Sequence, residues 1–160
     1  MELPKFQNEY NLTGEELLPH RPPFLFVDRL FCSDNTGALG EYTFTEEKND
    51  FFKGHFPTCP VVPGVVLVEA MAQVAGASVV ARKVIGDQVA FAMAAVDGVR
   101  FRLPFRPGDK LVTVVRIVRE RAPLGIYELK GYRNGEPNEK GEPAVECMVK
   151  CMIGKKVADK

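Results

Sequence analysis

Much of this chain alternates between hydrophobic and polar positions with a period of two, the pattern that predicts half-buried β-strands. Clusters of turn-forming Gly, Pro, Asn and Asp residues separate these stretches. One such cluster, residues 33–37, lies between the first two stretches and predicts a hairpin. The predicted strands lie at residues 22–32, 38–45, 89–101, 110–120, 125–133 and 144–153.

A different pattern occupies residues 61–81, where polar side chains almost vanish. Glu69, Gln73 and Ser78 are the only polar side chains in this stretch, and Pro63 suits the first turn of a helix. A helix that is apolar on every face has to be buried. The other strong helical signal is short and lies at residues 13–18.

Two environments would bury the long helix. A run of about 20 apolar residues is long enough to span a bilayer, but Glu69 and Gln73 would then lie near the bilayer centre, where polar groups are costly. The alternating strands offer the other environment, the concave face of an antiparallel sheet. We therefore expect an α+β hot-dog fold, in which a curved antiparallel β-sheet wraps a long central apolar helix.

Length and charge narrow the class of protein. The 160 residues fit a single domain, residues 1–160, with a frayed tail from about residue 155. Lys plus Arg and Asp plus Glu both total 21, so the net charge of zero gives no overall field for nucleic acid or an anionic membrane. The opening residues lack the pattern of a secretory signal, and we expect a cytoplasmic protein with no membrane insertion.

The four cysteines do not predict a metal site, because they show no CxxC and no histidine at a zinc-ligand spacing. Cys147 and Cys151 lie four residues apart on one predicted strand, about 13 Å from each other and beyond disulfide reach. We interpret both as small core hydrophobes. Neither a metal nor a cofactor is expected.

Glu69 is the first candidate for chemistry, because an acidic side chain inside an apolar helix is costly unless it is neutral or paired. One reading is structural: Glu69 makes a buried hydrogen bond, for instance with Gln73 one turn later. The other reading is catalytic, since burial favours the neutral acid that donates a proton.

His55 is the second candidate. It lies in the loop FFKGHFP, which leads directly to the start of the long helix, and imidazole suits a general base near neutral pH. A structural role is the alternative for any lone histidine. His20, beside Arg21 and two prolines, has no acidic partner in the sequence pattern and is interpreted as structural. Gly64 opens the helix, where unpaired N–H groups would stabilise a thioester oxygen, although an ordinary helix start explains it equally well.

These residues resemble the 3-hydroxyacyl-acyl-carrier-protein dehydratases of bacterial fatty acid synthesis, specifically the FabZ-type branch. The resemblance runs from about residue 17 to residue 109 with matched order and spacing, and then fades to a generic strand pattern. The matching motifs are LLPHR at 17–21, PFL at 23–25, VDR at 27–29, FF with GHFP at 51–57, PGV at 63–65, EAMAQ at 69–73, Asp97, RF at 100–101, Pro104 and PGD at 107–109.

The resemblance implies a site shared between two subunits. His55 and Glu69 would be the catalytic pair, facing each other across a homodimer interface, and the family often assembles three dimers into a hexamer. His55 would remove a proton from the carbon beside the thioester while Glu69 protonates the departing hydroxyl, although the sequence leaves open which group moves which proton. Gln73 would orient Glu69, and the Gly64 N–H would polarise the carbonyl. An apolar tunnel lined by Phe56, Val65, Met93 and Ala95 would hold the acyl chain.

The acidic acyl carrier protein needs a basic landing site on this chain. Six residues are candidates, although a solvated surface charge is the alternative for each: Lys53, Arg82, Lys83, Arg100, Arg102 and Arg106. Four positions depart from the family pattern, namely Thr58, Cys59, Met93 and Ala95, and the last two would reshape the tunnel. The polar loop at residues 134–143 is either an inert hairpin extension or a contact for a partner.

Glutamate at position 69, where the sister dehydratase-isomerase branch carries aspartate, favours dehydration without double-bond isomerisation. Three other functions compete with a carrier-linked dehydratase. A hot-dog thioesterase would share the fold and hydrolyse the thioester, and a CoA-linked hydratase would share the acid-base pair. A noncatalytic acyl-binding module would keep only the tunnel, and the set of His55, Gly64, Glu69 and Gln73 argues against it.

Overall fold

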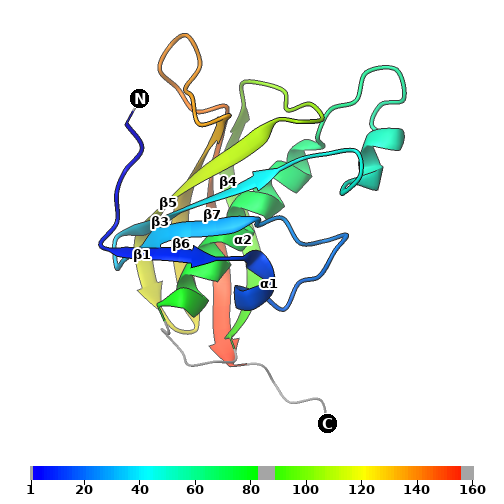
Figure 1. Cartoon of the computed structure of the whole chain (residues 1–160). Coiled ribbons are helices and arrows are strands. Elements are labelled where there is room, and N and C mark those ends of the chain that lie inside the picture. Colours follow the sequence, from blue (N-terminus) through cyan, green and yellow to red (C-terminus); the bar gives the residue numbers. More distant parts are fainter. Residues whose placement is uncertain (1, 83–88, 156–160) are drawn as a thin grey trace.

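A computed structural model describes residues 2–82 and 89–155 (Figure 1). A seven-stranded antiparallel sheet curves around one long helix, α2, in the order β1-β2-β3-β5-β6-β7-β4. The elements are β1 (Asn8–Leu12), α1 (Gly14–Leu17), β2 (Arg29–Ser33), β3 (Gly37–Thr43), the short 3-10 helix η1 (Asp50–Lys53), α2 (Gly64–Ala81), β4 (Val89–Phe101), β5 (Lys110–Arg121), β6 (Leu124–Arg133) and β7 (Val145–Lys155). This arrangement confirms the hot-dog fold expected from the sequence.

The predicted strands are recovered with one error and one omission. The first predicted strand was expected from residue 22, but β2 begins only at Arg29. Pro22 and Pro23 lack the N–H that a strand pairing requires, and the Phe26 N–H donates to a side chain on α2 instead of to a strand. β1, which is short and largely exposed, was not predicted from the sequence.

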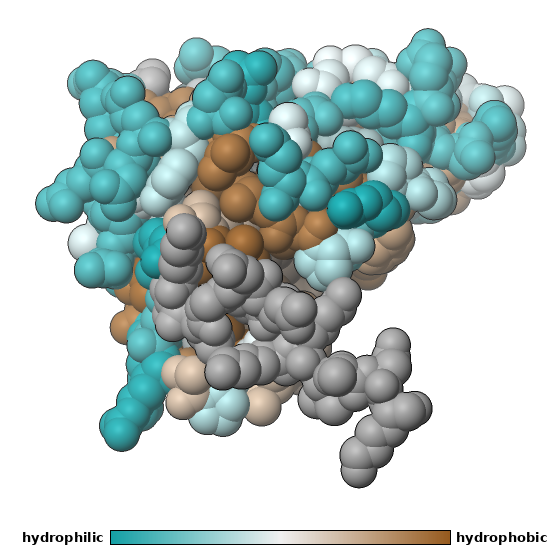
Figure 2. All heavy atoms as spheres, turned by 60° about the horizontal axis from the view of Figure 1, so that its bottom comes forward, coloured by the Kyte–Doolittle hydropathy of each residue, from teal (hydrophilic) through white to brown (hydrophobic). Residues whose placement is uncertain are grey.

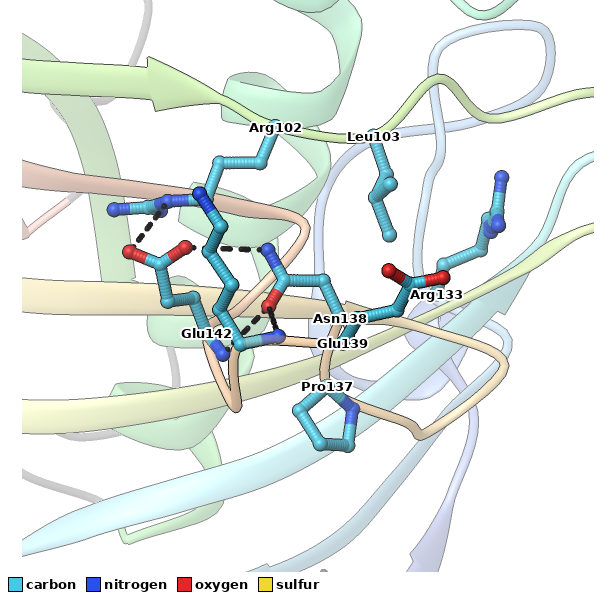
Figure 3. A pocket seen from close by; sticks show the side chains of 8 residues that line it. Arg102, Leu103, Arg133, Pro137, Asn138, Glu139 and Glu142 are labelled. Carbon is cyan, nitrogen blue, oxygen red and sulfur yellow. Dashed lines mark hydrogen bonds and ion pairs between the residues drawn. The ribbon is translucent and has the colours of Figure 1, made fainter.

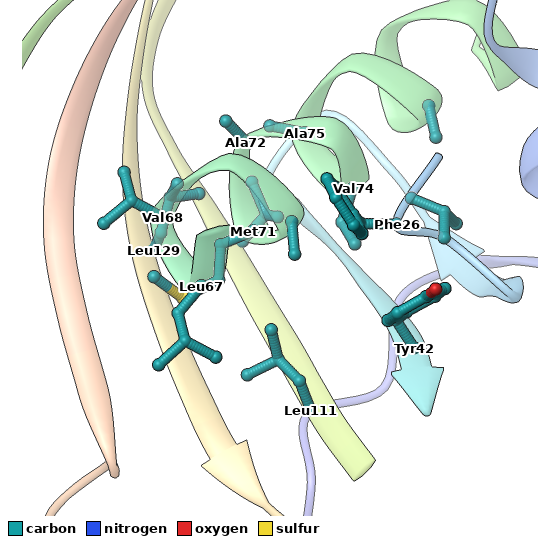
Figure 4. Close-up of a cluster of buried hydrophobic side chains, with 14 of the residues drawn as sticks. Phe26, Tyr42, Leu67, Val68, Met71, Ala72, Val74, Ala75, Leu111 and Leu129 are labelled. Carbon is teal, nitrogen blue, oxygen red and sulfur yellow. The ribbon is translucent and has the colours of Figure 1, made fainter. Parts of the chain in front are cut away.

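α2 is buried where the sheet wraps it, as Figure 4 shows for one stretch of the helix. Met71, Val74 and Ala75 are at most 1% exposed, and they pack with Leu111 of β5 and Leu129 of β6. The helix is long and apolar enough to cross a bilayer, but 67% of that stretch is buried inside the protein. The apolar surface that would face lipid is therefore already covered by the sheet.

Close approach between the helix and the sheet depends on a glycine of β6. A Cβ atom placed on Gly131 would lie 2.7 Å from Cδ1 of Leu111, 2.6 Å from Cγ1 of Val145 and 3.0 Å from Sδ of Met71. All three of these side chains are at most 1% exposed and have no room to move aside. Gly131 is thus a point at which α2 packs closely on the strands beneath it.

The far end of α2 is held by a buried ion pair. Arg82 donates to both carboxylate oxygens of Glu120 at 2.8 Å, and the Tyr127 hydroxyl donates to Glu120 at 2.7 Å. Burial opposes ionisation of Glu120, but the hydrogen bonds from Arg82 and Tyr127 outweigh it and lower the pKa of that carboxyl. The Arg82 side chain is 5% exposed, so it is not the surface contact for a carrier that the sequence suggested.

The expectation for Cys147 and Cys151 is confirmed, since both are buried and free. Burial raises the pKa of each thiol to about 12. Cys32 is also buried, whereas Cys59 is exposed in the loop before α2. The expected frayed tail falls mostly on residues 156–160, which lie outside the described residues, as does Lys83.

We predict that Gly131→Ala lowers the free energy of unfolding by about 1–3 kcal/mol, because the added methyl group overpacks the contact between β6 and α2. Gly154→Ala is the matched control, since a Cβ there has no neighbour within 4 Å. Urea denaturation of both variants at equal protein concentration measures the difference. Equal stabilities would contradict the close approach at Gly131.

We also predict that a thiol reagent such as DTNB modifies Cys59 rapidly in the native protein at pH 8 and leaves the other cysteines unmodified. Only the thiolate reacts, and burial keeps Cys147 and Cys151 protonated far above that pH. Mass spectrometry of the labelled peptides identifies the modified residue. Rapid labelling of a Cys59→Ser variant would show that the described core is wrong.

Candidate active site

His55 is fixed in the loop between η1 and α2 by its backbone and by its ring. The His55 N–H donates to the Phe51 carbonyl at 2.9 Å, and the His55 carbonyl accepts from the Val61 N–H at 2.9 Å. The ring nitrogen Nδ1 lies 2.9 Å from the Val61 carbonyl, and the ring stacks on Phe56 with centroids 4.2 Å apart. A carbonyl can only accept, so Nδ1 carries the hydrogen and Nε2 remains free to take a proton.

Glu69 is oriented by the side chain of Gln73, one turn further along α2. Gln73 Nε2 donates to Glu69 Oε1 at 2.9 Å and to the Phe24 carbonyl at 3.1 Å. Gln73 Oε1 accepts the Phe26 N–H at 2.7 Å, and the Gln73 residue is only 2% exposed. These three partners fix the direction of the amide, so the group that it turns toward Glu69 is the donor.

His20 is closer to the acid than the sequence suggested. Its Nε2 lies 3.9 Å from Glu69 Oε1, which corrects the expectation that His20 has no acidic partner. Neighbours far apart in sequence cannot be paired by inspection, and the one available signal was that His20 belongs to the LLPHR motif. Both side chains face a small cavity of about 190 Å³, which is lined by Leu18, His20, Glu69, Ala72, Gln73, Phe91, Ala92 and Met93.

The structure does not bring His55 and Glu69 together within one chain. No hydrogen bond or ion pair joins these two residues in the described structure, and His55 does not line the cavity that contains Glu69. His55 lies before the start of α2, whereas Glu69 lies more than one turn inside it. A single chain therefore presents a base and an acid at separate places.

Gly64 begins α2 and lies beneath an aromatic ring. A Cβ atom on Gly64 would be 2.8 Å from the Phe101 ring, so glycine permits β4 to approach the helix start. The Pro63 carbonyl accepts from the Val66 and Leu67 N–H groups, which are the first helical donors to find partners. Within residues 2–82 and 89–155, no acceptor is recorded for the Gly64 N–H, as expected at a helix N-terminus.

The predicted tunnel residues are scattered over the surface of the single chain. Phe56, Val65 and Met93 are 53%, 77% and 38% exposed, and Ala95 is half-buried. Among them only Met93 lines the cavity beside Glu69. In the described part of one chain these residues therefore do not enclose an acyl tunnel, and Phe56, Val65 and Met93 are open to solvent.

Exposed apolar residues also mark β4, which is the last strand at one edge of the sheet. Its side chains at Met93, Val96, Val99 and Phe101 are 37–52% exposed. Figure 2 shows one face of the molecule, on which hydrophobic atoms gather below a row of hydrophilic ones. A long apolar edge strand is a template for pairing with another chain.

The basic residues expected to contact a carrier protein differ in their exposure and in their ion-pair partners. Arg102 is held by Glu146 at 2.6 Å and by Glu142 at 3.3 Å, beside a cavity of about 690 Å³ under the loop at residues 134–143 (Figure 3). Lys53 is exposed and pairs with Asp50 in its own turn. Arg100 and Arg106 are exposed, and Arg106 Nη1 lies 3.5 Å from Cys59 Sγ.

No group of three His, Cys, Asp or Glu side chains in the described part of the chain is arranged to hold a metal ion. The chemistry that these side chains can perform is acid-base chemistry. His55 offers an open ring nitrogen, Glu69 offers a carboxyl group, and Gln73 and His20 surround that carboxyl.

Known proteins resemble the chain over most of its length. A dehydratase from Lactococcus lactis, named 3-hydroxyacyl-[acyl-carrier-protein] dehydratase FabZ, is 38% identical over 128 residues, covering 79% of this chain and 86% of its own. The proteins of the same name from Polynucleobacter asymbioticus and Thermomicrobium roseum are 38% and 40% identical, covering 89% and 80% of this chain and 91% and 85% of their own.

Solved structures confirm the fold. The dehydratase heterocomplex ApeI:P from Xenorhabdus doucetiae aligns with a TM-score of 0.73 at 16% identity, covering 92% of this chain and 94% of that one. The thioesterase PA1618 from Pseudomonas aeruginosa aligns with a TM-score of 0.55 at 12% identity, covering 79% and 81%. Residues 18–137 match the family description "FabA-like domain". With three quarters of its length in that match and relatives of about 40% identity, this chain belongs to the FabA-like family.

Proposed function

We propose that this protein dehydrates 3-hydroxyacyl thioesters carried on acyl carrier protein, giving the trans-2-enoyl thioester for fatty acid biosynthesis. The observation that carries the proposal is the hydrogen bond from the Gln73 amide to Glu69, which orients the Glu69 carboxyl beside a cavity. The relatives of this chain are named dehydratases. One hydrogen bond from the Gln73 amide orients that carboxyl, and the other two hold the amide itself in place. A carboxyl group oriented toward a cavity is placed to exchange a proton with a bound substrate.

The elimination needs a base and an acid on the two sides of one carbon–carbon bond. His55 Nε2 takes the proton from the carbon beside the thioester, since Nδ1 is already committed to the Val61 carbonyl. Glu69 gives its proton to the hydroxyl as the carbon–oxygen bond breaks, and water leaves. The proton gained by His55 returns to Glu69 directly or through solvent, so the enzyme ends each turnover as it began.

The thioester oxygen gains negative charge while the proton leaves the neighbouring carbon. The Gly64 N–H at the start of α2 is the donor we assign to that oxygen, where the positive end of the helix dipole adds to the hydrogen bond. One such donor is typically worth about 3 kcal/mol at the transition state. Phe56, Val65, Met93 and Ala95 would line the acyl tunnel once a second chain covers them.

A second copy of the chain completes the site. The apolar edge strand β4 supports a dimer in which two such strands pair, because its exposed residues would lose contact with water on association. That dimer would set His55 of one subunit against Glu69 of the other. Three such dimers would make the hexamer expected from the resemblance.

An acidic carrier protein would approach a basic rim beside the site. Lys53, Arg100 and Arg106 remain the assigned contacts, because all three are exposed. Arg102 is the weakest assignment, since two carboxylates already hold it. The cytoplasm is the assigned compartment, in keeping with cysteines that are free throughout.

One prediction of the proposed function is that the purified protein forms the enoyl product from 3-hydroxybutyryl-acyl carrier protein. His55→Ala and Glu69→Gln should each lower kcat by at least about 100-fold, since each removes one proton-transfer group. Enoyl absorbance measures dehydration, a thiol reagent measures hydrolysis, and circular dichroism checks that the variants fold. Thiol release without enoyl formation would make the protein a thioesterase, and faster turnover of the CoA-linked substrate would make it a hydratase of that class.

The second prediction concerns the dimer. Val96→Glu places a charge on the exposed face of β4 and should shift the protein toward monomer, with loss of turnover. Val118→Glu is the matched control, because Val118 is a 45% exposed valine on β5. Light scattering after size exclusion gives the mass of each variant, and the enoyl assay gives its activity. A fully active monomer would rule out a site shared between subunits.

A further inference from the structure

His20 is a titratable group beside Glu69 that the proposed mechanism does not use. Its Nε2 lies 3.9 Å from Glu69 Oε1, and the two side chains are 25% and 21% exposed. Its other ring nitrogen, Nδ1, is buried and has no hydrogen-bond partner in the described structure. An imidazole with one unpartnered nitrogen and one nitrogen facing a carboxylate needs an explanation beyond core packing.

The segment that carries His20 is fixed relative to α2. Arg21 Nη1 donates to the His20 carbonyl at 2.6 Å and to the Leu18 carbonyl at 2.8 Å. A few residues later, the Phe24 carbonyl and the Phe26 N–H bind the two ends of the Gln73 amide. The same amide that orients Glu69 therefore also fixes the segment from which His20 approaches it.

The proposed reaction explains why His20 would lie beside Glu69. Glu69 becomes a carboxylate at the moment it delivers its proton, and a carboxylate in a small, partly buried cavity needs donors around it. Gln73 supplies one donor. A ring N–H on His20 Nε2 would supply a second once the 3.9 Å separation shortens to about 3 Å, which is hydrogen-bond length.

We propose that His20 is a positioning residue for Glu69, donating from Nε2 to the carboxylate that forms when the hydroxyl departs. The inference rests on the proposed dehydration. His20 acts through Glu69 and is assigned no contact with the substrate. Other ionisable groups lie near the pair. Arg21 on the same segment donates to the His20 carbonyl, and burial and the Glu69 charge both raise the pKa of the Cys151 thiol of β7.

The first test reads the contact without reference to activity. The chain has only two histidines, so proton NMR of the imidazole rings resolves His20 once a His55→Asn variant has assigned the signals. In Glu69→Gln the ring-proton signals of His20 should shift, because the group that faces His20 Nε2 is replaced. Glu46→Gln, which changes an exposed carboxylate elsewhere, should leave these signals unchanged. Unchanged His20 signals in Glu69→Gln would overturn the inference.

The second test separates positioning from packing. His20→Leu keeps a large apolar side chain but no donor, and its kcat should fall about tenfold while KM changes less than about threefold. His20→Gln keeps an amide N–H near the position of Nε2 and should recover most of that loss. Thermal unfolding checks that both variants fold. Arg21→Ala is the control, because it loosens the same segment without changing His20.

The outcomes distinguish the two proposals. Equal losses in His20→Leu and His20→Gln, or a loss as large in Arg21→Ala, would show that His20 only packs the segment. If the wild-type protein forms no enoyl product and the NMR shift is still present, the contact stands and the dehydratase proposal fails. If dehydration is present without the shift or the rescue, the dehydratase proposal stands and the role of His20 fails.

Discussion

The buried amide of Gln73 is the interaction on which the site depends. It joins three parts of the chain, because it accepts from the Phe26 N–H, donates to the Phe24 carbonyl and donates to Glu69. Without it the buried Phe26 N–H would lose its acceptor, at a cost of about 1–3 kcal/mol for a buried polar group. The irregular segment before β2 is therefore held against α2 by a side chain and not by a strand pairing.

The same interaction explains how an acid can stay inside an apolar helix. Most of α2 after Val66 is buried, and Glu69 lies in a cavity that is lined by the segment containing His20 and by strand β4. The edge strand β4 exposes apolar side chains to water. His55 also lies apart from Glu69 within one chain. A fold that holds the proposed base and the proposed acid apart is consistent with assembly into a larger active unit.

Much of this could be predicted from the sequence because the signals are local. The bounds of β4 match the predicted strand, and α2 begins directly after Pro63, since alternation and helix starts are read from neighbouring residues. The hydrogen bond from Gln73 to Glu69 is also local, because residues four apart share one helix face. The roles proposed for Glu69 and Gln73 came from the motif at residues 69–73, which resembles that of known dehydratases, because periodicity does not indicate a catalytic role.

The errors arose where contacts are distant in sequence. β1 pairs with β2 but carries little hydrophobic alternation of its own, so no local pattern announced it. His20 and Glu69 are almost fifty positions apart, and Arg82 finds Glu120 only after the sheet has formed. Ion pairs of this kind depend on the three-dimensional path of the chain. For this reason no acidic partner was predicted for His20, and Arg82 was predicted to be a surface charge.

The most direct test of a site shared between subunits is to mix two inactive variants. His55→Ala and Glu69→Gln subunits, unfolded and refolded together in equal amounts, would form mixed dimers in which one of the two sites keeps an intact His55 and an intact Glu69. Random pairing predicts that turnover returns to about a quarter of the wild-type value. A mixture that assembles into mixed dimers and stays as inactive as its components would contradict the account.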